Sequence, residues 1–376
     1  MTSYMTKDSG TGGVLRTRPS DFIVDEVLDG KLATECLMGG RVGEGKVPLF
    51  VVAKLAPLDF LTLKSHIERL LGCRTKFCGM KDKFSISFQF FTARRILRNE
   101  IRVPGRLIVR MIGFRKDHLG PGLNWGNRFI IRIRGLPSRV KPPENLKVFP
   151  NYFSYQRFGS SPPFNHEIGR LLLRREFRRA AEALAAKKGL PEAKVKDHLM
   201  KNPSDPIGAL RRLGTKVLRI YVQAYQSYLF NRILSFRIEE EMLDPEPGDF
   251  ILDRDGWTRP YPCEGDLLLP VPGAYTKVKH KRTREFLDSL LRDEGVKLES
   301  FLIKEIPEAS ALGDLRRALE TPFHLRIKPV NGDVILIFNL RSGAYATSLL
   351  REIIKPLDPV RQGFLGEASL RTTQSS

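Results

Sequence analysis

The chain is poor in the residues that build metal centres and disulfide frameworks. Its 376 residues include only four cysteines and six histidines. The cysteines show no CxxC spacing and the histidines no HExxH spacing, which are the patterns expected of zinc sites. Free thiols in a reducing compartment are therefore expected, and we predict no metal site.

Long hydrophobic runs are also absent. No stretch approaches 18 consecutive apolar residues, the length that suggests a membrane-spanning helix. The first residues, MTSYMTKDSGTGG, are polar and lack the apolar core of a secretory signal. We therefore expect a cytoplasmic protein with no membrane partner.

Acidic residues are outnumbered by basic ones. The 63 lysines and arginines exceed the 42 aspartates and glutamates, which gives a formal net charge of +21. A charge of this size favours a polyanionic partner, nucleic acid before membrane. With 41% hydrophobic and 28% charged residues, the composition is that of a globular chain long enough for two or three domains.

The hydrophobic periodicity divides the chain into three regions. Alternating patterns typical of strands dominate up to residue 149, with one helical pattern ending at Gly72, and they return at 324–330 and 333–340. Between them, 245–280 is rich in Pro and Gly and is expected to be irregular. Helices are predicted at 165–173, 176–187, 192–200, 205–213, 219–242, 280–296 and 345–354. This order predicts an α+β fold with an antiparallel or mixed sheet, interrupted by a helical insertion.

The stretch KFCGMKDKFSISFQFFTARR, residues 76–95, is the most informative. Strict alternation predicts a strand at 84–92, with Phe84, Ile86, Phe88 and Phe90 on the buried face and the polar residues between them facing outward. Asp82 stands between two lysines just before this strand. It is either part of a solvated turn or a carboxylate that a rigid sheet presents to a site.

A second stretch, PNYFSYQRFG at residues 150–159, places four aromatic residues beside an Asn, a Gln and an Arg. An unstacked RNA base binds by stacking on an aromatic ring while polar groups contact its edge. The simpler interpretation is that Tyr152, Phe153 and Phe158 are core residues, and we expect this of two of the three. A third stretch, residues 222–234, has helical spacing and is expected to be helix core.

The chain resembles the TruD family of pseudouridine synthases over nearly its whole length. Six stretches match in the family's order, which makes the resemblance highly specific. They are RPSDFIVDE (18–26), GMKDKFSISFQFFT (79–92), GNRF (126–129), PNYFSYQRFG (150–159), AYQSYLFNR (224–232) and SGAYATSLLREI (342–353). The resemblance implies a discontinuous catalytic domain, residues 13–160 with 319–376, and an insertion domain special to this family at 161–318.

The resemblance also implies an activity and residue roles. The activity would be isomerisation of uridine to pseudouridine in tRNA, at position 13 in the typical member. Asp82 matches the catalytic aspartate, Phe153 the aromatic that stacks on the target uracil, and Asn151 a characteristic Asn. Arg16 falls where a basic residue, Lys in many members, lies near the aspartate. Ser154 replaces the usual Gly, and is expected to be tolerated if φ there is negative.

The chemistry explains why these residue types are needed. The N1–C1′ bond must break, the base must turn and C5 must bond to C1′. No step is redox or hydrolytic, so no metal or nucleotide cofactor is expected. A carboxylate can act as a nucleophile or as a base, and the sequence leaves both open. An adjacent guanidinium would hold Asp82 ionised and aimed. Stacking on Phe153 would partly offset the cost of flipping the uridine out.

Basic residues outside this site are candidates for RNA contact. Arg170, Arg174 and Arg178 are spaced by four and are predicted to contact phosphates, with a solvated basic face as the alternative. Arg351 is a further candidate, although it could form an exposed pair with Glu352. Two other functions remain open at this point: a non-catalytic RNA-binding protein or chaperone, and an RNA N-glycosylase that would release free uracil.

Overall fold

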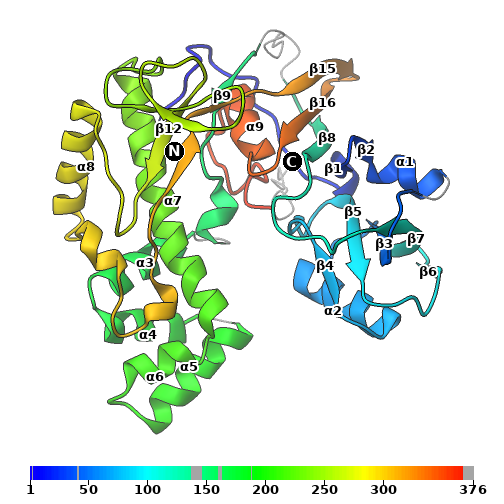
Figure 1. Ribbon diagram of the computed structural model, residues 1–376, viewed down its shortest axis with the longest axis horizontal. Helices are drawn as coiled ribbons and strands as arrows, with labels where there is room; N and C mark the ends of the chain where they lie inside the picture. The colour runs from blue at the N-terminus through cyan, green and yellow to red at the C-terminus, as the bar shows by residue number, and fades with distance from the viewer. Residues whose placement is uncertain (2, 40–41, 137–145, 160–162, 188, 367–376) are drawn as a thin grey trace, which may run out of the picture. The chain divides into compact units, whose positions relative to one another are not determined.

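The computed structural model describes residues 1, 3–39, 42–136, 146–159, 163–187 and 189–366 (Figure 1). Its contacts divide the chain into two compact units. The sheet unit contains Asp8–Phe149 and the described part of Thr321–Ser376, and the helical unit contains Met1–Lys7 and Pro150–Glu320. The chain therefore enters the helical unit and later returns, so the sheet unit is assembled from two separate segments.

The sheet unit is built on a ten-stranded mixed sheet in the order β15-β16-β8-β1-β5-β3-β7-β6, with β2 beside β1 and β4 beside β5. The expected α+β class with a mixed sheet is confirmed, because β1 and β5 pair in parallel while the neighbouring pairs are antiparallel. Its strands are β1 (Phe22–Leu28), β2 (Lys31–Leu32), β3 (Val47–Lys54), β4 (Thr75–Phe77), β5 (Ile86–Ala93), β6 (Glu100–Val103), β7 (Leu107–Arg115), β8 (Gly126–Ile133), β15 (Phe323–Val330) and β16 (Asp333–Arg341).

Among the described residues of the sheet unit, the α-helices are α1 (Ala33–Met38), α2 (Phe60–Leu71) and α9 (Ala346–Ile354). Helix α2 begins after Asp59, whose carboxylate accepts hydrogen bonds from the backbone N–H groups of Leu61 and Thr62, and ends at Gly72, where φ is +59°. Its buried side chains, Leu63 and Ile67 among them, form a core cluster with residues of β3, β5 and β7.

The expected orientation of the strand after Asp82 is wrong. Ser85, Ser87 and Gln89 are fully buried, whereas Ile86 and Phe88 are partly exposed. Strand β5 is central, between β1 and β3, and both of its faces carry buried side chains, such as Ser87 on one face and Phe90 on the other. Alternation identifies which side chains share a face, but it does not show that the polar face meets solvent.

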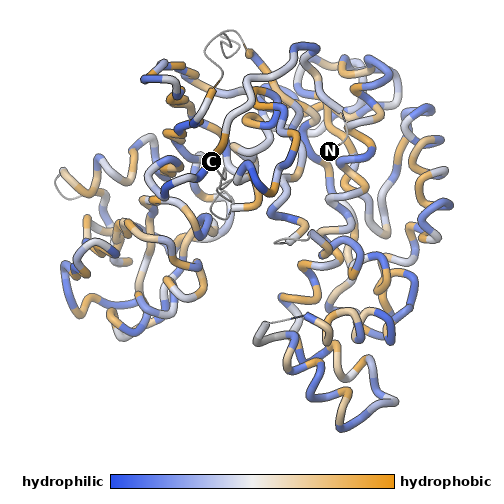
Figure 2. The backbone as a smooth tube through the Cα atoms, turned by 180° about the vertical axis from the view of Figure 1, so that it is seen from behind, coloured by the Kyte–Doolittle hydropathy of each residue, from blue (hydrophilic) through white to orange (hydrophobic). Residues whose placement is uncertain are grey.

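The helical unit contains α3 (Asn165–Leu173), α4 (Phe177–Ala185), α5 (Leu190–Lys201), α6 (Pro206–Arg211), α7 (Thr215–Glu239) and α8 (Lys281–Asp293). Figure 1 shows α7 as its long central helix, and α3 and α8 both contact it. Figure 2 shows hydrophilic and hydrophobic residues alternating along α3 to α6, as expected of amphipathic helices with one buried face. No helix among the described residues combines the length and apolar composition needed to cross a bilayer.

The segment expected to be irregular contains strands, which corrects that prediction. Strands β10 (Phe250–Leu252), β11 (Thr258–Pro260) and β12 (Asp266–Val271) join β13 (Asp314–Arg317) in a four-stranded sheet. Two of these strands have only three residues, too few for a period-2 pattern to stand out among the Pro and Gly residues. Strands β9 (Phe149–Pro150) and β14 (Leu319–Glu320) form a separate two-stranded pair.

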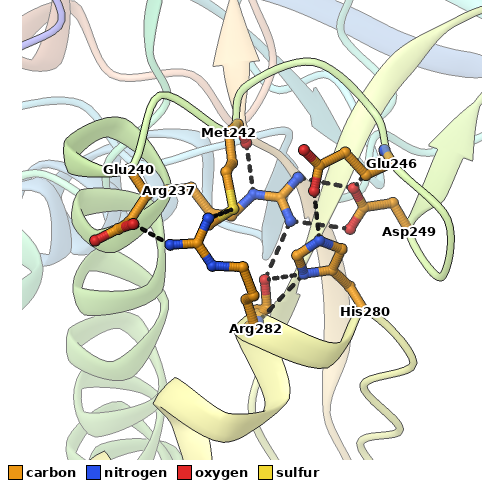
Figure 3. Close-up of polar contacts among 8 residues, drawn as sticks. Arg237, Glu240, Met242, Glu246, Asp249, His280 and Arg282 are labelled. Atoms are coloured by element: carbon orange, nitrogen blue, oxygen red, sulfur yellow. Dashed lines mark hydrogen bonds and ion pairs between the residues drawn. The ribbon is translucent and has the colours of Figure 1, made fainter.

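A buried ion pair connects Arg237, near the end of α7, to Asp249, which directly precedes β10 (Figure 3). The guanidinium of Arg237 is fully buried and donates to both carboxylate oxygens of Asp249, at 3.2 and 2.7 Å. It also donates to the carbonyl oxygen of Met242 at 2.6 Å and to the hydroxyl of Thr283 at 3.1 Å. Because its four hydrogen bonds end on three separate residues, Asp249, Met242 and Thr283, this one side chain links the end of α7 to the segment that follows it and to the start of α8.

We predict that Arg237→Met destabilises the protein by about 3–5 kcal/mol, because it leaves the Asp249 carboxylate buried without its partner. Urea unfolding followed by circular dichroism measures the change in midpoint. Arg254→Met is the matched control, since Arg254 pairs with Glu264 on an exposed surface and its removal should leave the midpoint nearly unchanged. Equal midpoints for Arg237→Met and wild type would contradict the prediction.

Candidate active site

Asp82 lies in the loop between β4 and β5, at the centre of the large sheet. Its side chain is one quarter exposed, and its carboxylate oxygen Oδ2 accepts a hydrogen bond from Nη2 of Arg16 at 2.6 Å. The interpretation of this turn as wholly solvated is therefore wrong. The structure brings Asp82 and Arg16 together, as the sequence analysis expected, and leaves part of the carboxylate open to a substrate.

Arg16 is fully buried and its guanidinium is held on several sides. Its Nη1 donates to the carbonyl oxygen of Gly363 at 2.6 Å, and the guanidinium carbon lies 3.8 Å from the centroid of the Phe22 ring. Burial lowers the pKa of Arg16 and the Asp82 carboxylate opposes this shift, but an arginine in a protein keeps its proton. A permanent, pre-positioned cation therefore faces Asp82.

A second buried cation, Lys54 at the end of β3, holds the backbone of the same loop. Its ammonium group donates to the carbonyl oxygens of Asp82, Lys83 and Ser85, at 2.9, 2.8 and 2.5 Å. Burial lowers the pKa of Lys54 to about 8, and the Asp82 charge partly opposes that shift. The sequence analysis missed this residue, although a lysine inside the apolar run LFVVAKL was a signal that could have indicated it.

Lys81 connects the loop to two other stretches that match the family motifs. Its ammonium donates to Oε1 of Glu26 at 2.9 Å and to Oδ1 of Asn127 at 2.6 Å. Glu26 is fully buried, and its other carboxylate oxygen accepts a hydrogen bond from the backbone N–H of Phe90. The stretches RPSDFIVDE, GMKDKF and GNRF, far apart in sequence, therefore meet through three polar side chains beneath Asp82.

Phe153 belongs to the helical unit and its backbone is clamped by one side chain of α7. Asn231 accepts a hydrogen bond from the backbone N–H of Phe153 and donates to its carbonyl oxygen, both at 2.9 Å. Tyr152 and Phe158 are buried core residues while Phe153 is only partly buried, which confirms the expectation for two of the three rings. Asn231 gives the AYQSYLFNR stretch a role beyond helix packing, which the sequence analysis did not find.

Asn151 acts on a neighbouring guanidinium rather than on Phe153 directly. Its carbonyl oxygen and its Oδ1 accept hydrogen bonds from Arg316 at 2.9 and 2.5 Å. The Arg316 guanidinium in turn lies 4.3 Å from the centroid of the Phe153 ring. Ser154, where the family usually has Gly, adopts φ −71°, so the substitution brings no backbone strain.

The arginines predicted to contact RNA phosphates are paired with carboxylates. Arg170 pairs with Glu167 and Glu294, Arg174 with Glu176 and Arg178 with Glu182. Arg170 lies in α3, Arg174 directly follows that helix, and Arg178 lies in α4, in agreement with the two separate helices predicted from the sequence. Phosphate contact by these residues stays a prediction, and each would exchange a carboxylate partner for a phosphate.

Arg351 differs from the sequence-based expectation. It lies in α9, where its guanidinium is 3.5 Å from Glu352, and both side chains are buried. The interpretation as an exposed pair is therefore wrong. RNA binding by Arg351 also stays a prediction, although its burial leaves little of the guanidinium for a phosphate.

The comparisons with known proteins agree with these motifs. The family profile described as tRNA pseudouridine synthase D (TruD) matches residues 1–196 and 187–353. A Methanopyrus kandleri protein named probable tRNA pseudouridine synthase D is 33% identical, covering 83% of this chain and 86% of its own length. One from Pyrobaculum aerophilum, of the same name, is 31% identical and covers 96% of each chain.

A solved structure extends the likeness from sequence to fold. The crystal structure assigned to tRNA pseudouridine synthase D (TruD) from Methanosarcina mazei superposes with a TM-score of 0.70. It is 25% identical in sequence and covers 94% of this chain and 96% of its own. Profile, relatives and fold agree over both units. The chain therefore belongs to the TruD family of tRNA pseudouridine synthases.

Proposed function

We propose that this protein converts uridine to pseudouridine in tRNA, at position 13, with Asp82 as its catalytic residue. The observation that carries the proposal is the carboxylate of Asp82, partly exposed and bound to the buried guanidinium of Arg16. A fixed cation of this kind pairs with the carboxylate and holds one of its oxygens in place. The other oxygen is then available to the nucleotide.

The reaction defines what the carboxylate must do. The N1–C1′ bond breaks, the uracil turns, C5 bonds to C1′, and the hydrogen of C5 is lost to solvent while N1 gains one. Asp82 can attack the sugar or base, or can draw a proton from the sugar, and both routes need an ionised carboxylate. Every step is an isomerisation or proton transfer, so the proposed reaction requires no nucleotide or redox cofactor.

Phe153 supplies the stacking surface in this proposal. Its backbone is held by two hydrogen bonds to Asn231. Its ring packs edge-to-face against Phe230, with the two ring centroids 5.3 Å apart. A ring held in this way binds a base without first losing conformational freedom, which is the advantage of a preorganised site. Asn151 supports the ring through Arg316.

We further propose that residues 13–160 with 319–376 form the catalytic domain and that 161–318 form the insertion. The large sheet around Asp82 and the helices after Asn165 support this assignment. In this arrangement tRNA is the partner and the cytoplasm is the compartment. The basic net charge of +21 supports binding to the tRNA backbone.

We predict that Asp82→Asn abolishes turnover and changes tRNA affinity by less than about tenfold, because the shape is kept and the charge is lost. The assay is tritium release from tRNA that carries 5-tritiated uridine, since only loss of the C5 hydrogen labels the water. An N-glycosylase would release free uracil instead, and a non-catalytic RNA-binding protein would give neither product. Turnover by the Asn variant within tenfold of wild type would exclude Asp82 as the catalytic group.

We predict that Phe153→Ala lowers kcat/KM by about 10- to 100-fold, because base–aromatic stacking contributes roughly 1–3 kcal/mol. Phe153→Tyr keeps the ring and should retain most of the activity. Phe164→Ala is the control, since Phe164 is a partly buried ring of the same unit that lies under Lys187. If Phe153→Ala and Phe164→Ala lower kcat/KM by the same factor, the Phe153 ring is not the stacking surface.

A further inference from the structure

Lys54 is an unusual residue for the interior of a sheet. Its side chain is only 1% exposed, and its neighbours across the strands are Ser87 on β5 and Leu107 on β7. No carboxylate within the described part of the chain forms an ion pair with it. An apolar residue would avoid the cost of removing an ammonium group from water, so stability alone does not account for a lysine here.

The hydrogen bonds of Lys54 explain its charge. An ammonium group has three N–H donors, and three carbonyl oxygens of the catalytic loop accept from it within 2.9 Å. Those carbonyls belong to Asp82, Lys83 and Ser85, the residues that lead from the catalytic aspartate into β5. Arg16 therefore fixes the side chain of Asp82, while Lys54 fixes its backbone.

We propose that Lys54 is a positioning residue for the isomerisation. It holds the backbone of residues 82–85, so that the Asp82 carboxylate keeps its position and orientation during the reaction. This inference rests on the proposed role of Asp82. Small displacements of a reacting group reduce rates strongly, so loss of the clamp affects the chemical step. Binding of tRNA is not affected, because the ammonium group is buried away from any phosphate.

The test compares Lys54→Met with Lys54→Arg. The methionine has similar length and no donors, whereas arginine restores N–H donors to the loop carbonyls. We expect Lys54→Met to lower the single-turnover rate at saturating protein by about 100-fold or more, as a loose catalytic constellation does, with tRNA Kd within about twofold of wild type. The single-turnover rate of Lys54→Arg should be about tenfold higher than that of Lys54→Met.

Lys76→Met is the matched control, because Lys76 is an exposed lysine on β4. Its removal should change neither the single-turnover rate nor the tRNA Kd. If Lys54→Met does not unfold cooperatively, Lys54→Gln, which keeps an amide donor, takes its place. A Lys54 variant that is folded and reacts within threefold of wild type overturns the inference, as does a rate loss matched by an equal affinity loss. A wild-type protein that releases no tritium would instead overturn the proposed function.

A second, independent feature is a hollow of about 520 Å³ in the helical unit, on the side of α7 that faces residues 309–316. Its lining includes Phe153, Arg157, Arg219, Gln223 and Arg316, all within the helical unit. Asp314 is the carboxylate in the lining, and one of its oxygens accepts a hydrogen bond from the adjacent Leu315 N–H. Three guanidinium groups against one carboxylate leave the hollow positively charged.

Two of these arginines differ from the arginines of α3 and α4. Arg157 donates to the neutral oxygens of Ser227 and Gln223, at 3.2 and 3.3 Å. Arg219 is exposed, and within the described residues neither it nor Arg157 forms an ion pair with a carboxylate. Their charge is therefore available to an anion, whereas Arg170, Arg174 and Arg178 are already paired.

We infer that this hollow binds an unstacked nucleotide of the RNA substrate next to the target uridine, with Arg157 and Arg219 on its phosphate. The inference rests on the proposed function, because Phe153, the ring proposed for the target uracil, also lines the hollow. The volume falls in the range of small-molecule sites, and an aromatic ring beside arginines is the combination that binds single-stranded nucleic acid.

The test measures tRNA affinity of the double variant Arg157→Gln/Arg219→Gln, in the Asp82→Asn protein so that no turnover occurs. We expect the affinity to fall by about tenfold or more at low salt. The slope of log affinity against log salt should flatten by about 0.7, since the two arginines contact one phosphate and each neutralised phosphate on a single strand contributes about 0.7. The control Arg179→Gln/Arg254→Gln removes the same charge from arginines paired with Glu176 and Glu264.

An unchanged slope in the Arg157→Gln/Arg219→Gln variant overturns the inference. An equal flattening in the control overturns it too, because net charge alone would then account for the effect. The affinity measurement is independent of the reaction. A flattened slope in a protein that lacks tritium release would therefore keep the RNA site and reject the proposed activity.

Discussion

The contact between Arg16 and Asp82 is the interaction on which the rest of the sheet unit depends. Nη2 of Arg16, whose side chain is fully buried, lies 2.6 Å from Oδ2 of Asp82, whose side chain is partly exposed. Removing a charged group from water costs several kcal/mol, so such a group persists only when neighbours satisfy it. Here the neighbours are Asp82, the carbonyl of Gly363 and the face of Phe22. Segments around residues 16–22, 82 and 363, far apart in the sequence, therefore contact one guanidinium group.

The same constraint explains the buried polar side chains around the loop that carries Asp82. Lys54 and the pair of Glu26 with Lys81 occupy positions where a sheet optimised for stability alone would place apolar side chains. Each makes hydrogen bonds to the loop or to the strands beside it, so local structure is determined by directional contacts. A rigid support of this kind is what a catalytic side chain requires, and sites of function are where proteins depart from the simplest packing.

The helical unit uses a comparable arrangement to place an aromatic ring. Asn231 from α7 binds both backbone polar groups of Phe153, and Asn151 holds the Arg316 guanidinium beside the ring. Hydrogen bonds to backbone atoms fix where a residue lies without using its side chain. In the proposed site, both units therefore position a side chain through its main chain, Asp82 by Lys54 and Phe153 by Asn231.

The sequence by itself identified the family, the α+β class, Asp82 with its basic partner Arg16, and the helices other than α1, because these follow from local motifs and periodicity. The tertiary structure decided which face of β5 is buried, where short strands form in 250–271, and that Arg351 and Glu352 are not exposed. It also revealed Lys54, Glu26 and Asn231 as supports of the site. Periodicity reports which side chains share a face, whereas burial and hydrogen-bond partners depend on segments far away in sequence that only folding brings together.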